Sequence, residues 1–390
     1  MKKVLLRAPL LTNSGYGVHS RQIFSWLLAE SQKSNFKLGV ECLNWGSCSW
    51  IIDRQSEGGL IGEIMDRSNP LEEKYDVTFQ VQLPDEWNPS LGYYNVGITA
   101  AVETDRCNPS WIEAANKMDA VVVPSTFTKN VMKRSGILMK TIEVIPEWFN
   151  EEIKEDLKGL DLNLSTNFNF VIVGMLTGAE SDTDRKNIVN TIKYLCQKFK
   201  DNPDVGIVVK TSMGKYSSFD KKHTKDYFQK LVEVCRPDSD YPKINLLYGS
   251  MSKKEMAKLY KSEDVKCYVS LTRAEGYGLP IIEAAASGLP IIATNYSGHL
   301  EFLKGQEFLH VDYNLITIPK KKVDKRIFIE NTRWAEPDKN SFFTRLDQLY
   351  NNYNLHKQNA IKIQRHIVEK YNKRECIKLY RQKFGDLLKT

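Results

Sequence analysis

Short apolar runs alternate with helical segments along the whole chain, and this alternation limits the possible folds more than any other feature. In the first half, five apolar runs are expected to be strands: Val4–Ala8, Leu38–Leu43, Val77–Leu83, Val96–Val102 and Ala120–Pro124. Helices are expected between them, notably over Val18–Glu30 and Pro109–Lys117, and Ser125 is placed to cap the next helix. Strands that alternate with helices are typical of parallel α/β layers.

The same alternation returns after a polar interruption. Residues 151–161 are strongly charged and residues 163–169 are turn-rich, which marks a domain boundary. The second half has five further strand candidates: Phe170–Met175, Gly206–Thr211, Ile244–Tyr248, Val265–Leu271 and Pro290–Thr294. After about Asn340 the pattern is helical to the end.

The length of 390 residues suits two domains. We therefore expect an α/β fold of two Rossmann-like domains that face one another across a cleft. The first domain is expected at residues 1–150 and the second at residues 165–345. Residues 346–390 are expected to form C-terminal helices that pack back toward the first domain.

The composition excludes several classes of protein. No run approaches the roughly 20 apolar residues of a membrane span, and the apolar run after Met1 stops at Arg7, which favours a strand over a signal peptide. We therefore expect a cytoplasmic protein without membrane insertion. The seven cysteines are scattered and form no C-x-x-C pair, which argues against a disulfide framework and a zinc site. The net charge of +7 favours an anionic partner, although solvated lysines account for it equally well.

The segment Glu275–Pro290 contains glycines and two acidic residues between an apolar strand and a helix. Gly276 and Gly278 let the backbone approach a ligand closely, and amides at the helix start can face a diphosphate. Glu275 on the loop and Glu283 in the first helical turn can face one cleft, and carboxylates suit hydroxyl-rich ligands. Either residue alone is more often an exposed helix-start glutamate, but together they predict a binding site.

This segment resembles the E-x7-E signature of family 4 glycosyltransferases, which are retaining enzymes of the GT-B fold. The resemblance implies a nucleotide-diphosphate sugar as donor, which we expect to be a UDP-sugar. It implies that Glu275 contacts hydroxyls of the sugar in catalysis and that Glu283 holds the ribose. The donor-binding residues that it implies in the signature are Glu275, Gly276, Tyr277, Gly278, Leu279 and Glu283. The resemblance extends to Ile291–Glu301 and to Trp334–Asp338, which is similar to the turn before the C-terminal helices.

Arg185 and Lys186 lie at the start of a predicted helix, after the strand that ends at Met175. In related enzymes a basic pair in this region neutralises the donor diphosphate, and the resemblance gives Arg185 and Lys186 this donor-binding and catalytic role. Many relatives carry Arg directly after the strand glycine, where this chain has Gly174 and Met175. We therefore expect Arg185 to substitute for it, because fixed cations stabilise the charge on a leaving diphosphate.

The segment Asn13–His19 is expected to be a loop between the first strand and the first helix. Gly15 and Gly17 are a weak dinucleotide-binding signal, because the third glycine of that motif is missing. In a GT-B fold this loop overhangs the cleft, which predicts that both glycines bind the donor and that His19 and Arg21 contact the acceptor. A surface position for His19 is the alternative.

Glu103 and Arg106 follow the predicted strand Val96–Val102, at the carboxyl end where ligands bind in parallel sheets. Many relatives place a His near this point to contact the sugar, whereas this chain offers Glu103. We expect Glu103 to act in catalysis and both residues to face the acceptor. A plain surface turn is the competing interpretation.

The sequence leaves two alternatives for the acceptor. The segment from Arg7 to Arg21 is similar to glycosyltransferases of tailed bacteriophages, some of which modify hydroxymethylated pyrimidines in DNA. This resemblance implies double-stranded DNA as acceptor, with phosphate contacts from Lys and Arg. The candidate contacts are Arg21, Arg54, Lys129, Lys133 and Arg134. A cell-envelope polysaccharide or a lipid-linked sugar is the alternative acceptor.

Two other classes and a metal site are less consistent with the sequence. Asp238-Ser239-Asp240 has the form of a metal-binding D-x-D, but it lies in a polar turn, so we expect no catalytic metal and no cofactor. An NAD-dependent epimerase or dehydrogenase would need a complete glycine fingerprint. A non-catalytic nucleic-acid-binding protein would explain the basic stretch Lys320–Arg326 but not the two glutamates in their glycine frame.

Overall fold

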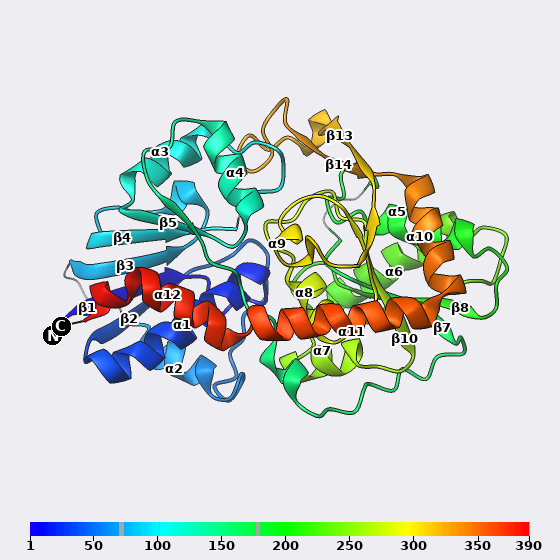
Figure 1. The fold of residues 1–390 in the computed structure, drawn as a ribbon, viewed down its shortest axis with the longest axis horizontal. Coiled ribbons are helices and arrows are strands. Elements are labelled where there is room, and N and C mark those ends of the chain that lie inside the picture. The colour runs from blue at the N-terminus through cyan, green and yellow to red at the C-terminus, as the bar shows by residue number, and fades with distance from the viewer. Residues whose placement is uncertain (70–73, 101, 177–179, 390) are drawn as a thin grey trace. The chain divides into compact units, whose positions relative to one another are not determined.

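Two parallel β-sheets form the centres of two units in the computed structural model of the protein, shown in Figure 1. The structure describes residues 1–69, 74–100, 102–176 and 180–389. Unit 1 comprises Met1–Val102, Arg106–Trp148 and Lys373–Thr390, and unit 2 comprises Glu103–Asp105 and Phe149–Asn372. The expected class, two parallel-sheet α/β domains with C-terminal helices, is confirmed.

The sheet of unit 1 has the strand order β2-β1-β3-β4-β5-β6, and every pairing is parallel. Its strands are β1 (Lys3–Ala8), β2 (Lys37–Cys42), β3 (Tyr75–Val81), β4 (Gly92–Ile98), β5 (Ala120–Val123) and β6 (Ile142–Val144). Its helices are α1 (Gly15–Ser34), α2 (Leu60–Asp66), α3 (Pro109–Lys117), α4 (Thr126–Ser135) and α12 (Lys373–Leu388). Figure 1 shows α1 and α12 on one face of this sheet and α3 and α4 on the other.

Aromatic packing joins the last helix to this sheet. Trp26 of α1 is fully buried, with its ring centroid 5.3 Å from that of Phe79 in β3 and 4.9 Å from that of Tyr380 in α12. Burial of such large rings is a main source of stability in a domain core. The C-terminal helix α12 is therefore part of the hydrophobic core of unit 1.

The sheet of unit 2 has the order β12-β11-β10-β7-β8-β9 and is also parallel throughout. Its strands are β7 (Phe168–Val173), β8 (Val205–Thr211), β9 (Lys243–Tyr248), β10 (Val265–Ser270), β11 (Ile291–Thr294) and β12 (Leu309–Val311). One hydrophobic core packs its first face under α5 (Ile188–Lys198), α6 (Ser218–Cys235) and α10 (Lys339–Asn351). A second core packs the other face under α7 (Lys253–Tyr260), α8 (Leu279–Ala286) and α11 (Tyr353–Lys370).

The strand order of unit 2 contains a switch point between β7 and β10. The chain starts at β7, continues outward through β8 and β9, and then crosses to β10 on the opposite side of β7. Loops that leave the carboxyl ends of such neighbouring strands diverge and leave a crevice, which is where ligands bind in open parallel sheets. The loops after β7 and β10 are therefore the expected place for a site in this unit.

An antiparallel hairpin is a feature of unit 2 that the sequence analysis missed. Its strands are β13 (Tyr313–Thr317) and β14 (Arg333–Pro337). The expectation of a turn at Trp334–Asp338 was wrong, because Trp334 to Pro337 are paired with β13 and only Asp338 lies beyond the strand, as the cap of α10. Trp334 is completely buried, so tertiary packing rather than the local sequence pattern determines that this segment forms a strand.

Two further boundaries differ from the expectation. The strand expected at Val96–Val102 is β4 (Gly92–Ile98), which starts earlier because Gly92 already pairs with Tyr75; residue 101 lies outside the described residues. The segment Asn13–His19 is not a loop, because α1 begins at Gly15. The Ser14 hydroxyl accepts a hydrogen bond from the Gly17 amide at 2.9 Å, which caps the helix earlier than expected.

We predict that Gly17→Ala destabilises unit 1 while Gly15→Ala does not. A Cβ at Gly17 would lie 2.1 Å from the carbonyl oxygen of Thr12, whereas a Cβ at Gly15 has nothing within 4 Å. Overpacking of this kind costs about 1–3 kcal/mol, and an unhindered Gly-to-Ala change stabilises by about 0.4–1 kcal/mol. Urea unfolding of the two variants measures the difference. Equal midpoints would show that Thr12 does not constrain this turn.

Candidate functional site

Charged side chains gather where the loops after β7 and β10 meet. Glu275 follows β10, and Arg185 and Lys186 follow β7 immediately before α5. The strand β10 pairs directly with β7. The switch point of the sheet thus brings together residues that are far apart in the sequence, and Lys186 and Glu275 are separated by 89 positions.

These residues form one buried ion cluster. Lys186 Nζ lies 2.6 Å from Glu275 Oε1, and an Arg185 guanidinium nitrogen lies 3.3 Å from Glu275 Oε2. Arg185 Nε is also 2.8 Å from Glu103 Oε2. Glu275 is only 7% exposed and Arg185 8%, so the attraction is little screened by water. The structure therefore brings together four residues that the sequence predicted as catalytic.

The cations fix the charge of Glu275. Burial would raise the pKa of its carboxyl, but Lys186 and Arg185 lower that pKa to about 2. Thr272 adds a hydrogen bond from its hydroxyl to Glu275 Oε1 at 3.0 Å. Glu275 is therefore a carboxylate at any pH near neutrality, and an anionic or hydroxyl-rich ligand meets a fixed set of charges.

The loop that carries the cations is held by two residues that sequence reasoning missed. The Asp184 carboxylate accepts hydrogen bonds from the amides of Lys186 (3.1 Å) and Ile188 (2.7 Å), which shapes the turn into α5. Arg273 is 3% exposed and donates to the carbonyls of Ser181 and Asp184, each at 2.7 Å. An Asp before a helix and an Arg two residues before Glu275 were the available sequence signals.

Glycines let two backbone segments lie against one another beside Glu275. Gly278 has a φ of +103° and ends the loop before α8. A Cβ at Gly298 would lie 2.0 Å from the carbonyl oxygen of Gly276. The Gly298 amide instead donates to the Glu275 carbonyl at 2.8 Å, and the Glu275 amide donates to Ser297 Oγ at 2.9 Å. The glycine frame thus positions Glu275 through its backbone.

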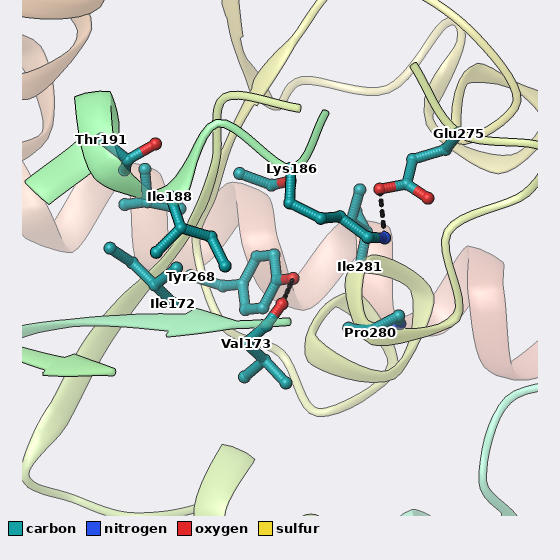
Figure 2. A pocket seen from close by; sticks show the side chains of 11 residues that line it. Ile172, Val173, Lys186, Ile188, Thr191, Tyr268, Glu275, Pro280 and Ile281 are labelled. Carbon is teal, nitrogen blue, oxygen red and sulfur yellow. Dashed lines mark hydrogen bonds and ion pairs between the residues drawn. The ribbon is translucent and has the colours of Figure 1, made fainter. Parts of the chain in front are cut away.

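A pocket opens at this edge of the sheet, as Figure 2 shows. Lys186 and Glu275 form its charged part and point toward one another. Its apolar part comes from β7, β10 and the starts of α5 and α8, and includes Ile172, Val173, Ile188, Tyr268, Pro280 and Ile281. A mixed apolar and charged lining of this kind is typical of small-molecule sites.

Other predicted donor residues of the signature lie deeper in unit 2. Tyr277 is 2% exposed and packs edge-on against Phe302, so its ring belongs to the core. Glu283 is half-buried on α8, beside Tyr260 of α7, and is absent from the lining of the pocket. Burial raises the pKa of Glu283 to about 7, opposed by Lys253 and by the Tyr260 hydroxyl.

The predicted site residues of unit 1 have different surroundings. Gly15 is exposed at the start of α1, and Arg106 is exposed on its loop. Arg21 is 3% exposed and paired with Glu57 at 2.7 Å, and it donates to the Leu10 and Thr12 carbonyls at 2.8 and 3.0 Å. An acceptor contact by the Arg21 guanidinium would require these bonds to break.

His19 is a buried residue of unit 1, with 2% exposure. Its Nδ1 lies 3.9 Å from Oε1 of Glu147, which is 3% exposed. Burial lowers the pKa of His19 and raises the pKa of Glu147, so burial favours the uncharged form of each group. The surface position that we considered for His19 was wrong, because α1 turns its ring into the core.

The described residues contain neither a metal cluster nor a membrane span. Within the described ranges, no group of three or more His, Cys, Asp or Glu side chains is arranged to hold a metal ion. Asp238-Ser239-Asp240 lies in the connection between α6 and β9. No helix in the described part of the chain combines the length and the apolarity that crossing a bilayer requires.

Comparison with known families matches the segment that contains Glu275. Residues 242–324 match the family described as Glycosyl transferases group 1. The sucrose synthase of Melioribacter roseus is 24% identical over 177 residues. These residues are 43% of this chain but 22% of that protein, so this chain corresponds to less than a quarter of the relative's length.

Solved structures resemble the chain over its whole length. HepE from Anabaena, solved with UDP and glucose, has a TM-score of 0.65 at 11% identity, with 99% of this chain and 100% of that chain covered. Sucrose-phosphate synthase from Thermosynechococcus elongatus has a TM-score of 0.64 at 14% identity, with 99% and 100% covered. A glycosyltransferase from Rickettsia africae ESF-5 has a TM-score of 0.62 at 14% identity, with 100% and 99% covered.

The fold of this chain is therefore that of the GT-B glycosyltransferases. Within this fold, residues 242–324 are the segment that is similar to the group 1 glycosyltransferases. Its relatives include the sucrose synthase and its structural neighbours include the sucrose-phosphate synthase.

We predict that Glu283→Gln changes the pH dependence of stability. A folded-state pKa of about 7 lies above the ordinary value of 4.5, so the wild-type carboxyl favours folding fully below pH 4.5. That contribution is lost as pH rises through 7. The variant should therefore gain on the order of 2–3 kcal/mol relative to wild type between pH 4.5 and 8. Urea unfolding across this range measures it, and a constant difference would contradict the raised pKa.

Proposed function

We propose that the protein is a retaining glycosyltransferase that moves a sugar from a UDP-sugar to a hydroxyl acceptor. One observation carries the proposal: Glu275, Lys186 and Arg185 form a buried ion cluster at the switch point of unit 2. Nucleotides bind at this position in open parallel sheets. The donor class is also supported by the matched segment and by HepE, which was solved with UDP and glucose.

The cluster is suited to a leaving diphosphate. Breaking the glycosidic bond to a nucleotide leaves negative charge on the diphosphate, and Lys186 and Arg185 are held in place to receive it. In the structure, Glu103 forms an ion pair with Arg185, and Glu275 forms one with Lys186. Phosphate oxygens are the same kind of charge-assisted acceptor, so a bound donor can share or replace these carboxylates without exposing an unpaired buried cation.

In this proposal the acidic residues have separate roles. Glu275 lines the pocket and accepts hydrogen bonds from hydroxyls of the transferred sugar, while Glu283 on α8 belongs to the ribose side. Glu103, which pairs with Arg185, positions that guanidinium. We propose front-face transfer with retention, in which the leaving phosphate takes the proton of the acceptor hydroxyl. The salt bridges of Glu275 support this assignment, because a carboxylate held by two cations is a weak nucleophile.

We propose hydroxymethylated pyrimidines in DNA as the acceptor, on the basis of the bacteriophage-like opening of the sequence. Exposed cations on α4, Lys133 and Arg134, are suited to phosphate contacts. Arg21 is less suited, because it is buried and paired with Glu57. The formal charge of +7 divides into +4 for unit 1 and +3 for unit 2, so the acceptor proposal rests on local cations rather than on a basic domain.

Glu275→Ala should lower the rate of sugar transfer by about a thousandfold, because it removes a charge that acts on the reacting sugar. The control is Glu263→Gln, which changes an exposed glutamate at the start of the β10 region. Release of UDP from a panel of UDP-sugars measures the rate, and circular dichroism checks the fold. A rate equal to that of the control would remove Glu275 from the reaction.

Transfer to DNA that contains 5-hydroxymethylcytosine should give a glycosylated nucleoside with the donor's anomeric configuration. Digestion with mass spectrometry identifies the product, and NMR reports the configuration. Lys133→Ala and Arg134→Ala should weaken DNA binding and make it less dependent on salt. Product only on cell-envelope polysaccharide or lipid-linked sugar would replace the DNA acceptor, and an inverted product would exclude retention.

A further inference from the structure

The basic stretch Lys320–Arg326 lies in the loop between β13 and β14, and that loop has a defined structure. Ile318, Phe328 and Trp334 form a small hydrophobic core of their own. The Asp324 carboxylate accepts hydrogen bonds from the backbone amides of residues 326, 327 and 328, at 2.8 to 2.9 Å. The loop is therefore folded rather than simply charged, and each of its cations has its own position.

The hairpin is attached to the loop that carries Arg185 and Lys186. The buried Arg273 guanidinium bridges the two, because it donates to the Ser181 and Asp184 carbonyls and, at 2.8 Å, to Glu336 of β14. The Ala335 amide in turn donates to the Arg273 carbonyl at 3.0 Å.

Two further ion pairs continue this attachment. Arg333 of β14 binds Asp105 at 2.8 Å, two residues after Glu103, and Lys321 pairs with Glu180 and Asp182. The hairpin loop is thus fixed beside the ion cluster of the site.

Lys322 differs from the other cations of this loop. Lys321 forms ion pairs with Glu180 and Asp182, and Lys320 is exposed. Lys322 is half-buried, with Nζ 4.4 Å from the centroid of the Phe328 ring. In the described part of the chain, no carboxylate pairs with Lys322 within ion-pair distance. Burial is the main cause that lowers the pKa of Lys322, and the Glu103 carboxylate opposes it.

The charged side chains of the ion cluster do not by themselves balance the charge of a bound diphosphate. Arg185 and Lys186 are matched by Glu103 and Glu275, so these four side chains together carry no net charge. A diphosphate brings a negative charge on each phosphate. A ligand of this charge in a half-buried site is favoured by a cation that has no other ionic partner.

We propose that Lys322 binds the diphosphate of the donor, as a third cation that the β13–β14 hairpin brings to the Arg185–Lys186 pair. This inference rests on the proposed function and adds a donor-recognition residue to it. The Lys322 ammonium group lies over the Phe328 ring, and this cation–π contact orients the group without pairing it with a carboxylate. The basic stretch that suggested nucleic-acid binding thus contributes one residue to nucleotide recognition.

Calorimetric titration of UDP and of uridine tests the proposal. Lys322→Met removes the charge but keeps an apolar chain against Phe328, and Lys320→Met is the matched control on the same turn. Lys322→Met should bind UDP about tenfold more weakly, which corresponds to about 1.4 kcal/mol. Its affinity for uridine, which has no phosphate, should equal that of wild type, and Lys320→Met should match wild type with both ligands.

Three results would overturn the inference. Unchanged UDP affinity in Lys322→Met would exclude the contact, and an equal loss of UDP and uridine affinity would show a structural effect of the hairpin. Lys186→Met separates this from failure of the proposed function. If Lys186→Met weakens UDP binding and Lys322→Met does not, only the role of Lys322 fails. If wild type itself does not bind UDP, the proposed donor fails and the inference fails with it.

Discussion

The buried pairing of Glu275 with Lys186 and Arg185 is the interaction on which the site depends. Charges that are removed from water cost several kcal/mol each unless they are paired, so no member of the cluster can be lost without leaving the others uncompensated. The arrangement keeps two cations at the switch point of a parallel sheet. In the proposed function, these two fixed cations contact the phosphate oxygens of the donor.

Unit 2 supports this cluster from several directions. The order of β7 and β10 brings the two loops together, the glycine contacts fix the backbone of Glu275, and Arg273 ties the cation loop to the hairpin. Much of this support consists of hydrogen bonds between backbone groups and of hydrogen bonds from the Arg273 guanidinium to backbone carbonyls. Such contacts hold side chains within the narrow limits that a transferase needs for the reacting groups.

The strands and the acidic motif could be predicted because they follow from local patterns. Buried parallel strands are largely apolar, as in Ala120–Val123, and Ser125 caps α4 as its position in the sequence predicts. Glu275 could be named as a candidate site residue from the glycines around it, and the structure pairs it with Lys186 and Arg185. The β13–β14 hairpin could not, because Trp334 and Arg273 stabilise it through tertiary contacts. The burial of Arg21 could not be predicted either, because it depends on the ion pair with Glu57, which is 36 residues away in the sequence.

The central claim is that the Glu275 cluster holds the diphosphate of an activated sugar. A crystal structure of the protein grown with UDP and its donor sugar tests this claim most directly. The account predicts phosphate oxygens within hydrogen-bonding distance of Lys186 Nζ and of the Arg185 guanidinium, with the sugar hydroxyls toward Glu275. Diphosphate density elsewhere on the protein, with the ion pairs of Glu275 unchanged and no ligand against them, would contradict it.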